Sequence, residues 1–150
     1  MKITLDVDDV KIDIPKHIKK VRSPKMWKFA AQQWHRLYKD YVPMRTGVLY
    51  NQVIIKPNLI IHTAPYAHYM YEGRLYGPNY PIVEGGRVVG YFSQRGRPKK
   101  PTFRMLKFSK EQHLKATRKW DKAATPTQGP KLVKTMQKYI DGGRIDLDGK

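Results

Sequence analysis

Residues 23–41 read SPKMWKFAAQQWHRLYKDY, and this stretch decides the fold. Ser23 can cap a helix that starts at Pro24, a position where the missing N–H of proline costs nothing. Apolar side chains then recur at steps of three and four residues, at Trp27, Ala30, Ala31, Trp34, Leu37, Tyr38 and Tyr41. We therefore predict an amphipathic helix of about 18 residues that ends before Pro43 and packs its aromatic stripe on a sheet.

Alternating apolar and polar residues on both sides of this helix predict the strands of that sheet. Before the helix, MKITLDVDDVKIDIP alternates about a central pair of aspartates, which predicts an N-terminal β-hairpin over residues 1–15. After the helix, residues 48–55 and 59–63 predict two strands joined at 56–58. We expect an α+β fold: a small, mainly antiparallel sheet with one long helix packed on it and C-terminal helices beside it.

The middle of the chain is rich in turn residues. Residues 64–73 place four aromatic or large apolar side chains within six positions and end on glycine, which predicts a buried turn or a short helix. Residues 73–101 contain many glycines and prolines, so we predict long loops there with one strand over 88–92.

The C-terminal part predicts two helices. The first starts at Ser109, where Gln112 completes a capping box, and runs to about Ala124. The second starts at Pro130 and ends before the glycine pair at 142–143.

The chain has 150 residues, a length typical of one domain, and no cysteine. We expect a single domain over residues 1–141 and a flexible tail at 142–150. The lack of cysteine excludes disulfide scaffolds, metal–cysteine sites and thiol nucleophiles. No stretch approaches the roughly 18 consecutive apolar residues that a membrane span needs, and no signal-peptide core is visible, so we expect no membrane partner.

The charge is unevenly distributed. The chain carries 30 Lys and Arg against 12 Asp and Glu, a net charge of +18, but the acids gather at the two ends. Residues 15–140 hold 26 basic and five acidic side chains. Such a basic body favours a polyanionic or acidic partner.

The densest basic stretch is 95–110, which has seven basic residues, no acid and interleaved phenylalanines. These side chains are candidates for a contact with the DNA backbone or with the acidic ends of an adjacent copy, and the sequence leaves both open. The seven are Arg95, Arg97, Lys99, Lys100, Arg104, Lys107 and Lys110.

No pattern typical of an enzyme occurs in the sequence. The basic body has few carboxylates, and its histidines lack the spacing of metal ligands. His62 and His68 flank a turn, and we expect one of them on the surface and the other hydrogen-bonded within the fold. We predict no catalytic residue, no metal site and no cofactor.

Four segments, in order, resemble a known family. They are Ala31-Gln32 on the first helix, DYVPMRTGVL at 40–49, APYAHYMYEG at 64–73 and WDKAA at 120–124. This order is similar to that of the minor capsid, tail-completion and head–tail joining proteins of long-tailed bacteriophages, which typically show a helix, a VPxDTGxL turn, a hairpin, a PYAxYxxxG segment and a WxxxA helix. The resemblance covers about residues 25–140. Its motif residues are Pro43, Thr46, Gly47, Pro65, Tyr66, Tyr69, Gly73 and Trp120.

The motif residues have structural explanations. Thr46-Gly47 provides a tight turn into the strand expected at Val48, and Pro65 kinks the chain so that Tyr66, Tyr69 and Met70 turn onto the sheet. Arg45 departs from the pattern, because the family usually has an acidic residue at its position.

The resemblance implies a structural virion protein in the neck of a tailed phage, made in the host cytoplasm. It implies a homo-oligomeric ring, a hexamer or a multiple of it, whose partners are other neck, portal-side and tail proteins and the DNA passing through the lumen. Acidic ends and a basic body suit the head-to-tail contacts of such a ring. The alternative is a sequence-independent nucleic-acid-binding protein that grips phosphate with residues 95–110.

Overall fold

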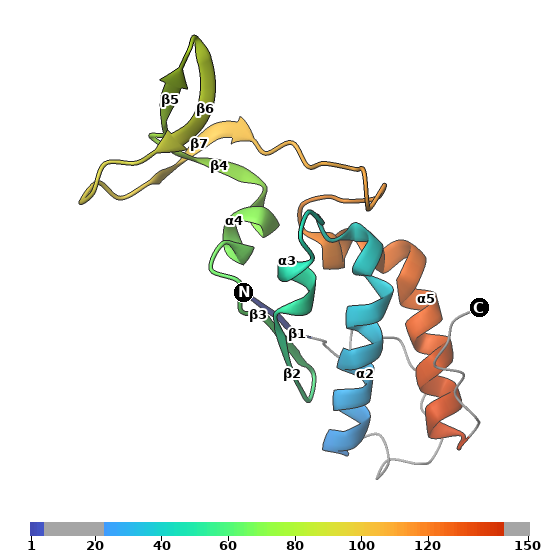
Figure 1. The fold of residues 1–150 in the computed structure, drawn as a ribbon. Coiled ribbons are helices and arrows are strands. Elements are labelled where there is room, and N and C mark those ends of the chain that lie inside the picture. Colours follow the sequence, from blue (N-terminus) through green and yellow to red (C-terminus); the bar gives the residue numbers. More distant parts are fainter. Residues whose placement is uncertain (5–22, 143–150) are drawn as a thin grey trace.

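The computed structural model describes residues 1–4 and 23–142, and its fold is α+β, as predicted (Figure 1). A body of helices and one sheet carries a long β extension made of two two-stranded sheets. The elements in chain order are β1 (Lys2–Thr4), α2 (Pro24–Leu37), the 3-10 turn η1 (Lys39–Tyr41), α3 (Val48–Asn51), β2 (Val53–Lys56), β3 (Leu59–His62), α4 (Ala67–Glu72), β4 (Arg74–Gly77), β5 (Tyr80–Glu84), β6 (Arg87–Phe92), β7 (Lys100–Met105) and α5 (Trp120–Ile140).

Much of the predicted N-terminal hairpin lies outside the described residues. Of residues 1–15, the structure describes 1–4, in which β1 pairs antiparallel with β3. The predicted tail lies outside the described residues from 143 onward.

The sheet of the body is antiparallel, with strand order β1-β3-β2. Ile61 of β3 lies opposite Lys2 on one side and Ile54 on the other. The central strand contributes Ile60 and His62 to the core, and both are almost completely buried. The predicted pair of strands after the first helix is therefore present as β2 and β3, but the first of them begins later than predicted.

Residues 48–51 form the helical turn α3 rather than the start of a strand. Gly47 has a φ of 81°, and its carbonyl accepts the N–H of Asn51 at 2.9 Å, which closes one helical turn. The glycine thus begins a turn of helix, and the prediction that it leads directly into a strand was wrong. The turn buries Leu49 in the core and leaves the strand only residues 53–56.

Helix α2 begins as its sequence predicts. The N–H of Met26 donates to Ser23 Oγ at 3.2 Å, and Pro24 occupies the first position. The helix packs against β2, β3 and α5 (Figure 1), and five of its side chains are buried. These are Met26, Ala30, Ala31, Trp34 and His35.

The regular part of α2 ends at Leu37, four residues before the predicted end. The N–H groups of Tyr41 and Val42 bond to carbonyls three residues back, which tightens the chain into η1. Tyr38 and Tyr41 remain buried, so the apolar stripe continues into this turn.

One helix, α5, replaces the two predicted C-terminal helices. It runs through Pro126 and Pro130, and it bends along its length (Figure 1), as prolines inside a helix usually require. Its buried residues recur at helical spacing on the side facing α2, so tertiary packing outweighs the loss of two N–H groups. They are Trp120, Ala124, Leu132, Met136 and Ile140.

The helix predicted to start at Ser109 is absent, because residues 106–119 are held by contacts with the body. His113 Nδ1 donates to the carbonyl of Val42 at 2.8 Å, and the N–H of Thr117 donates to that of Tyr41 at 3.0 Å. These bonds anchor the segment along η1 in an irregular path. Ser109 Oγ accepts only the N–H of Glu111, at 3.4 Å.

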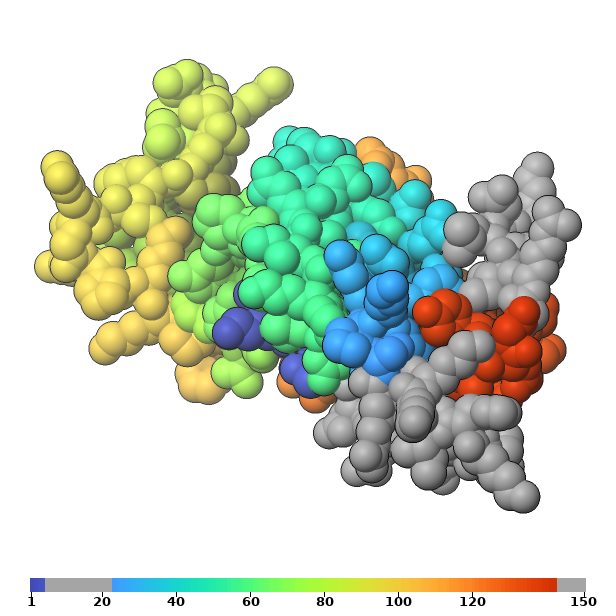
Figure 2. All heavy atoms as spheres, turned by 90° about the horizontal axis from the view of Figure 1, so that it is seen from below, coloured from blue at the N-terminus to red at the C-terminus, as the bar shows by residue number. Residues whose placement is uncertain are grey.

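The strand predicted over 88–92 is present as β6, but the long loops predicted around it within 73–101 were wrong. This region also holds β4, β5 and the first two residues of β7, and its glycines and prolines occupy turns and strand edges. Strand β4 pairs with β7, and β5 pairs with β6 through a turn at Gly85-Gly86, where φ is 55° and 78°. We call residues 74–105 the arm, because they extend from the body as seen in two perpendicular views (Figures 1 and 2).

Candidate interaction surfaces

The outer hairpin of the arm is apolar on both faces. Opposite residues in an antiparallel pair share a face, and neighbours along a strand alternate. The register pairs Val83 with Val88, so these two lie on one face, and their exposed fractions are 56% and 53%. The register shifts between Ile82 and Val83, so Val88 does not share a face with Phe92 although they lie four positions apart along β6. Ile82 and Phe92 lie on the other face, and their exposed fractions are 41% and 48%.

Further large side chains of the arm are exposed as well. Tyr91 is 68% exposed, and Phe103 on β7 is completely exposed. A two-stranded hairpin alone in water is marginally stable, and monomeric proteins rarely expose contiguous apolar patches of this kind. The arm therefore has the character of an interaction surface.

The root of the arm is firmly attached to the body. The carbonyl of Gly73 accepts the N–H of Leu106 at 2.9 Å, and the carbonyl of Tyr71 accepts the N–H of Lys119 at 3.0 Å. The rings of Tyr69 and Tyr76 meet edge to face at 4.6 Å, which joins α4 to β4.

Gly73 is at the point where α4 becomes the arm, and its φ is 65°. A Cβ at this position would lie 2.8 Å from Cβ of Arg118, closer than two carbons can approach. Both the dihedral angle and the close approach require glycine here.

The seven basic residues predicted as contacts are all exposed, but the structure does not gather them into one patch. Arg95, Arg97 and Lys99 lie in the connection between β6 and β7, Lys100 and Arg104 lie on β7, and Lys107 and Lys110 follow the arm. None of them forms an ion pair within residues 1–4 and 23–142.

Several motif residues of the sequence meet in one groove beside the root of the arm. It has a volume of about 280 Å³, and we call it the motif groove. Its apolar part comes from the turn before α3, from α4 and from Phe108, while Arg45 and Lys107 supply two exposed cations. The lining residues are Pro43, Met44, Arg45, Thr46, Gly47, Leu49, Tyr66, Met70, Lys107, Phe108 and Ser109.

Two tyrosines of the second motif do not pack on the sheet, contrary to the prediction. Tyr66 and Tyr69 are 41% and 44% exposed, whereas Ala67 is buried and Met70 packs against the core. The short helix α4 turns only one side inward, so these tyrosines point outward. Pro65 is exposed, and Tyr66 becomes part of the motif groove.

Sequence analysis did not predict the polar network inside the core. His62 donates from Nδ1 to the carbonyl of Leu49 at 2.9 Å, because a carbonyl can only accept. Its Nε2 then accepts the hydroxyl of Tyr38, also at 2.9 Å. His68 is exposed, so the expectation of one surface and one hydrogen-bonded histidine is confirmed.

The motif residue Trp120 is completely buried at the start of α5. It contacts the rings of His62 at 5.4 Å and Tyr71 at 5.0 Å, both edge to face. Its Nε1 has no hydrogen-bond partner among the described residues.

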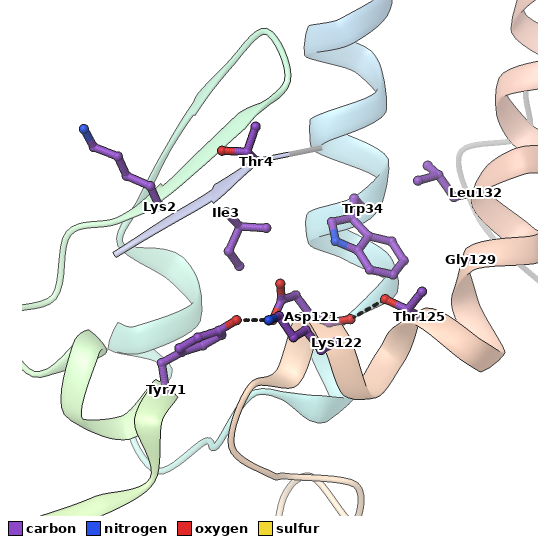
Figure 3. Close-up of a pocket in the computed structure, with 10 residues that line it drawn as sticks. All are labelled: Lys2, Ile3, Thr4, Trp34, Tyr71, Asp121, Lys122, Thr125, Gly129 and Leu132. Carbon is purple, nitrogen blue, oxygen red and sulfur yellow. Dashed lines mark hydrogen bonds between the residues drawn. The ribbon is translucent and has the colours of Figure 1, made fainter. Parts of the chain in front are cut away.

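A second cavity of about 570 Å³ lies between β1, α2 and α5 (Figure 3). At its wall Tyr71 donates its hydroxyl to Asp121 Oδ1 at 2.8 Å, and this bond joins α4 to α5. Burial, together with the carboxylate of Asp121, raises the pKa of Tyr71, so the phenol stays neutral. The cavity also borders Lys2, Thr4, Trp34 and Lys122.

The described residues contain no group of three or more side chains that could hold a metal ion. Within the same residues, no helix is both long enough and apolar enough to cross a membrane. Comparisons of the chain with family profiles, with curated proteins and with solved structures gave no match.

Proposed function

We propose that this chain is a structural virion protein of a tailed phage: a neck, or head–tail joining, component of the tail-completion or minor-capsid type. It assembles as a homo-oligomeric ring, a hexamer or a multiple of it, at the head–tail junction. Other neck, portal-side and tail proteins are its partners, and DNA passes through its lumen. The chain performs no catalysis.

The observation that carries this proposal is the arm. Its outer hairpin exposes apolar side chains on both faces, which a monomer in water does not favour. A ring with head-to-tail contacts places one patch of each copy against a different patch of the next, and an arm that reaches beyond its own body suits such a contact. The ordered motif segments agree with this assignment, and several of them form one groove beside the arm.

Electron microscopy of the purified protein, with sedimentation velocity over a wide concentration range, tests the proposal. We expect closed rings that Val88→Asp converts to smaller species, because burying an unpaired carboxylate in an apolar contact is unfavourable. Leu114→Asp is the matched control, since Leu114 is an exposed apolar residue outside the arm. A wild-type chain that stays monomeric at every concentration would contradict the ring.

The exposed basic residues favour one alternative function, a sequence-independent nucleic-acid-binding protein. The seven cations between 95 and 110 lack ion-pair partners within the described parts of the chain, so they can displace counter-ions from a phosphate backbone. The arm's apolar faces, by contrast, gain nothing from a phosphate chain.

Salt titration of binding to random-sequence duplex DNA separates the two functions. A monomer whose affinity falls by about 10³-fold or more between 50 and 200 mM salt would favour the alternative. An assembled ring that binds duplex weakly and with a shallow salt dependence would support the neck protein.

A further inference from the structure

The tip of the arm carries a lone acid beside apolar side chains. Glu84 is the one acidic residue between positions 74 and 105, and it lies at the end of β5 opposite Arg87. Val83 and Val88, each more than half exposed, are the neighbouring pair on the opposite face of the hairpin, whereas Glu84 shares its face with Arg87. No ion pair joins Glu84 to Arg87 or to any other residue in the described parts of the chain.

The motif groove offers the complementary chemistry. Its lining contains two exposed cations, Arg45 and Lys107, and no acid. Met44, Met70 and Phe108 supply apolar surface in the same groove. A hairpin tip with a carboxylate on one face and valines on the other fits this combination when it inserts between the walls of the groove, because the carboxylate can meet the cations on one side while the valines meet the apolar lining on the other.

A chain cannot place its own tip in its own groove in this conformation. The groove lies on the body at the root of the arm and is formed by residues 43–49, 66, 70 and 107–109, whereas the tip lies at the far end and points away from the body (Figure 1). The complementary pair can therefore meet only between two copies.

We propose that the arm tip of one copy, Val83, Glu84 and Val88, docks in the motif groove of the next copy, with Glu84 between Arg45 and Lys107. This inference rests on the proposed ring and names the contact that closes it. The contact is heterologous, with tip on one side and groove on the other, so repeating it around an axis generates a ring when the rotation between copies closes. An acidic residue at position 45 would instead repel Glu84.

Reversing the charge of Glu84, and then exchanging the charges of residues 84 and 45, tests whether these two residues pair between copies. We expect Glu84→Lys to weaken self-association by about tenfold or more, because it places three cations together. Adding Arg45→Glu in the same chain should recover most of the loss by restoring an opposite pair. Asp40→Lys makes the same change in charge on an exposed position of the body, and it should alter self-association less than about twofold.

Cross-linking tests the same contact without depending on charge, and the absence of native cysteine makes it specific. Glu84→Cys and Thr46→Cys chains, mixed and oxidised, should form a covalent heterodimer on a denaturing gel. Mixing the Glu84→Cys chain with a Gln33→Cys chain is the control, because residue 33 lies on α2 away from the groove. This mixture should form little covalent heterodimer.

The outcomes distinguish this inference from the proposed function. If the wild type assembles but neither Glu84→Lys nor Arg45→Glu weakens it, the tip-to-groove contact is overturned and the ring stands. Equal cross-linking to residues 33 and 46 likewise overturns the contact alone. If the wild type never assembles, the proposed function itself fails.

Discussion

Two buried histidines connect the pH to the stability of the body. His62 bridges Leu49 and Tyr38 inside the core, and His35 Nε2 donates to the carbonyl of Tyr50 at 3.0 Å while its ring stacks on that tyrosine at 4.2 Å. Each ring is held as a neutral group, because burial disfavours a second proton. Burial lowers the pKa of His35 to about 4 and lowers the pKa of His62 as well.

We predict that the protein loses stability as the pH falls below about 6.5, the pKa of an unfolded histidine. Since the folded pKa lies below the unfolded one, the folded state binds fewer protons, and stability is full above this pH and declines toward pH 4. Urea unfolding between pH 8 and pH 4.5 measures this decline. His35→Gln keeps a donor for Tyr50 without titrating, so its decline should be shallower. A slope equal to that of the wild type would show that His35 does not contribute.

Trp120 combines a large apolar ring with a polar atom that lacks a partner among the described residues. We predict that Trp120→Ala costs about 3–5 kcal/mol of unfolding free energy, because it leaves a cavity in the core. Trp120→Phe should cost clearly less, since it also removes an unsatisfied N–H, whose burial costs about 1–3 kcal/mol. Urea unfolding of both variants provides the measurement. Equal losses would indicate that Nε1 has a partner elsewhere.

At the scale of elements, α2 could be predicted from the sequence, whereas β6 was the one strand of the arm that could. Ser23-Pro24 and the spacing of Trp27, Ala30 and Trp34 are local signals, and the cap and buried face follow them. The pairing of β5 with β6 lacks such a signal, because a hairpin that is apolar on both faces has no alternation to detect. Its turn at Gly85-Gly86 was visible only as a loop.

Long-range contacts account for the two other errors in the helices. Pro126 and Pro130 locally favour a break, but the helix continues through them because its buried face packs on α2. His113 holds residues 106–119 on η1 through the carbonyl of Val42. Neither contact is visible in a local pattern.

The same limit applies to the candidate sites. The seven basic residues between 95 and 110 could be identified from the sequence. The sequence did not show that, of these seven, only Lys107 lines the motif groove. The sequence also identified four motif residues of the groove, Pro43, Thr46, Gly47 and Tyr66. Lys107 lies beside them only because the chain comes back to the body after the arm, and no local pattern predicts that path.

The junction between α4 and β4 is sensitive to a single methyl group. We predict that Gly73→Ala lowers the unfolding free energy by about 1–2 kcal/mol for the left-handed backbone alone, with a further loss from the contact with Arg118. Gly85→Ala is the control, because Gly85 shares the positive φ but has nothing within 4 Å of its Cβ position. Thermal unfolding measures the loss of stability in both variants. An equal loss would indicate that Arg118 moves away from the new methyl group without lowering the unfolding free energy.

At the scale of the whole molecule, the core belongs to the body and the arm contributes no residue that is fully buried. The arm leaves the body at Arg74 and returns at Met105, and these residues pair across β4 and β7. The buried core is therefore complete without any side chain of the outer hairpin.

We predict that replacing residues 75–104 with a short turn leaves a body that unfolds cooperatively. Its unfolding free energy should change by about 1 kcal/mol or less apart from the lost contact between Tyr69 and Tyr76. Self-association should disappear in the same variant. Urea unfolding and sedimentation velocity measure the two properties, and a body that fails to fold would show that the arm is part of the folding unit.

The pairing of Arg74 with Met105 also has an evolutionary consequence. Because the chain departs and returns at one point, natural selection can lengthen, shorten or exchange the intervening strands without rebuilding the core. Related chains should then diverge fastest in this segment, and a replacement of Glu84 should be accompanied by compensating replacements at Arg45 or Lys107. Correlated substitutions of this kind in related sequences would identify a contact between two copies of the chain.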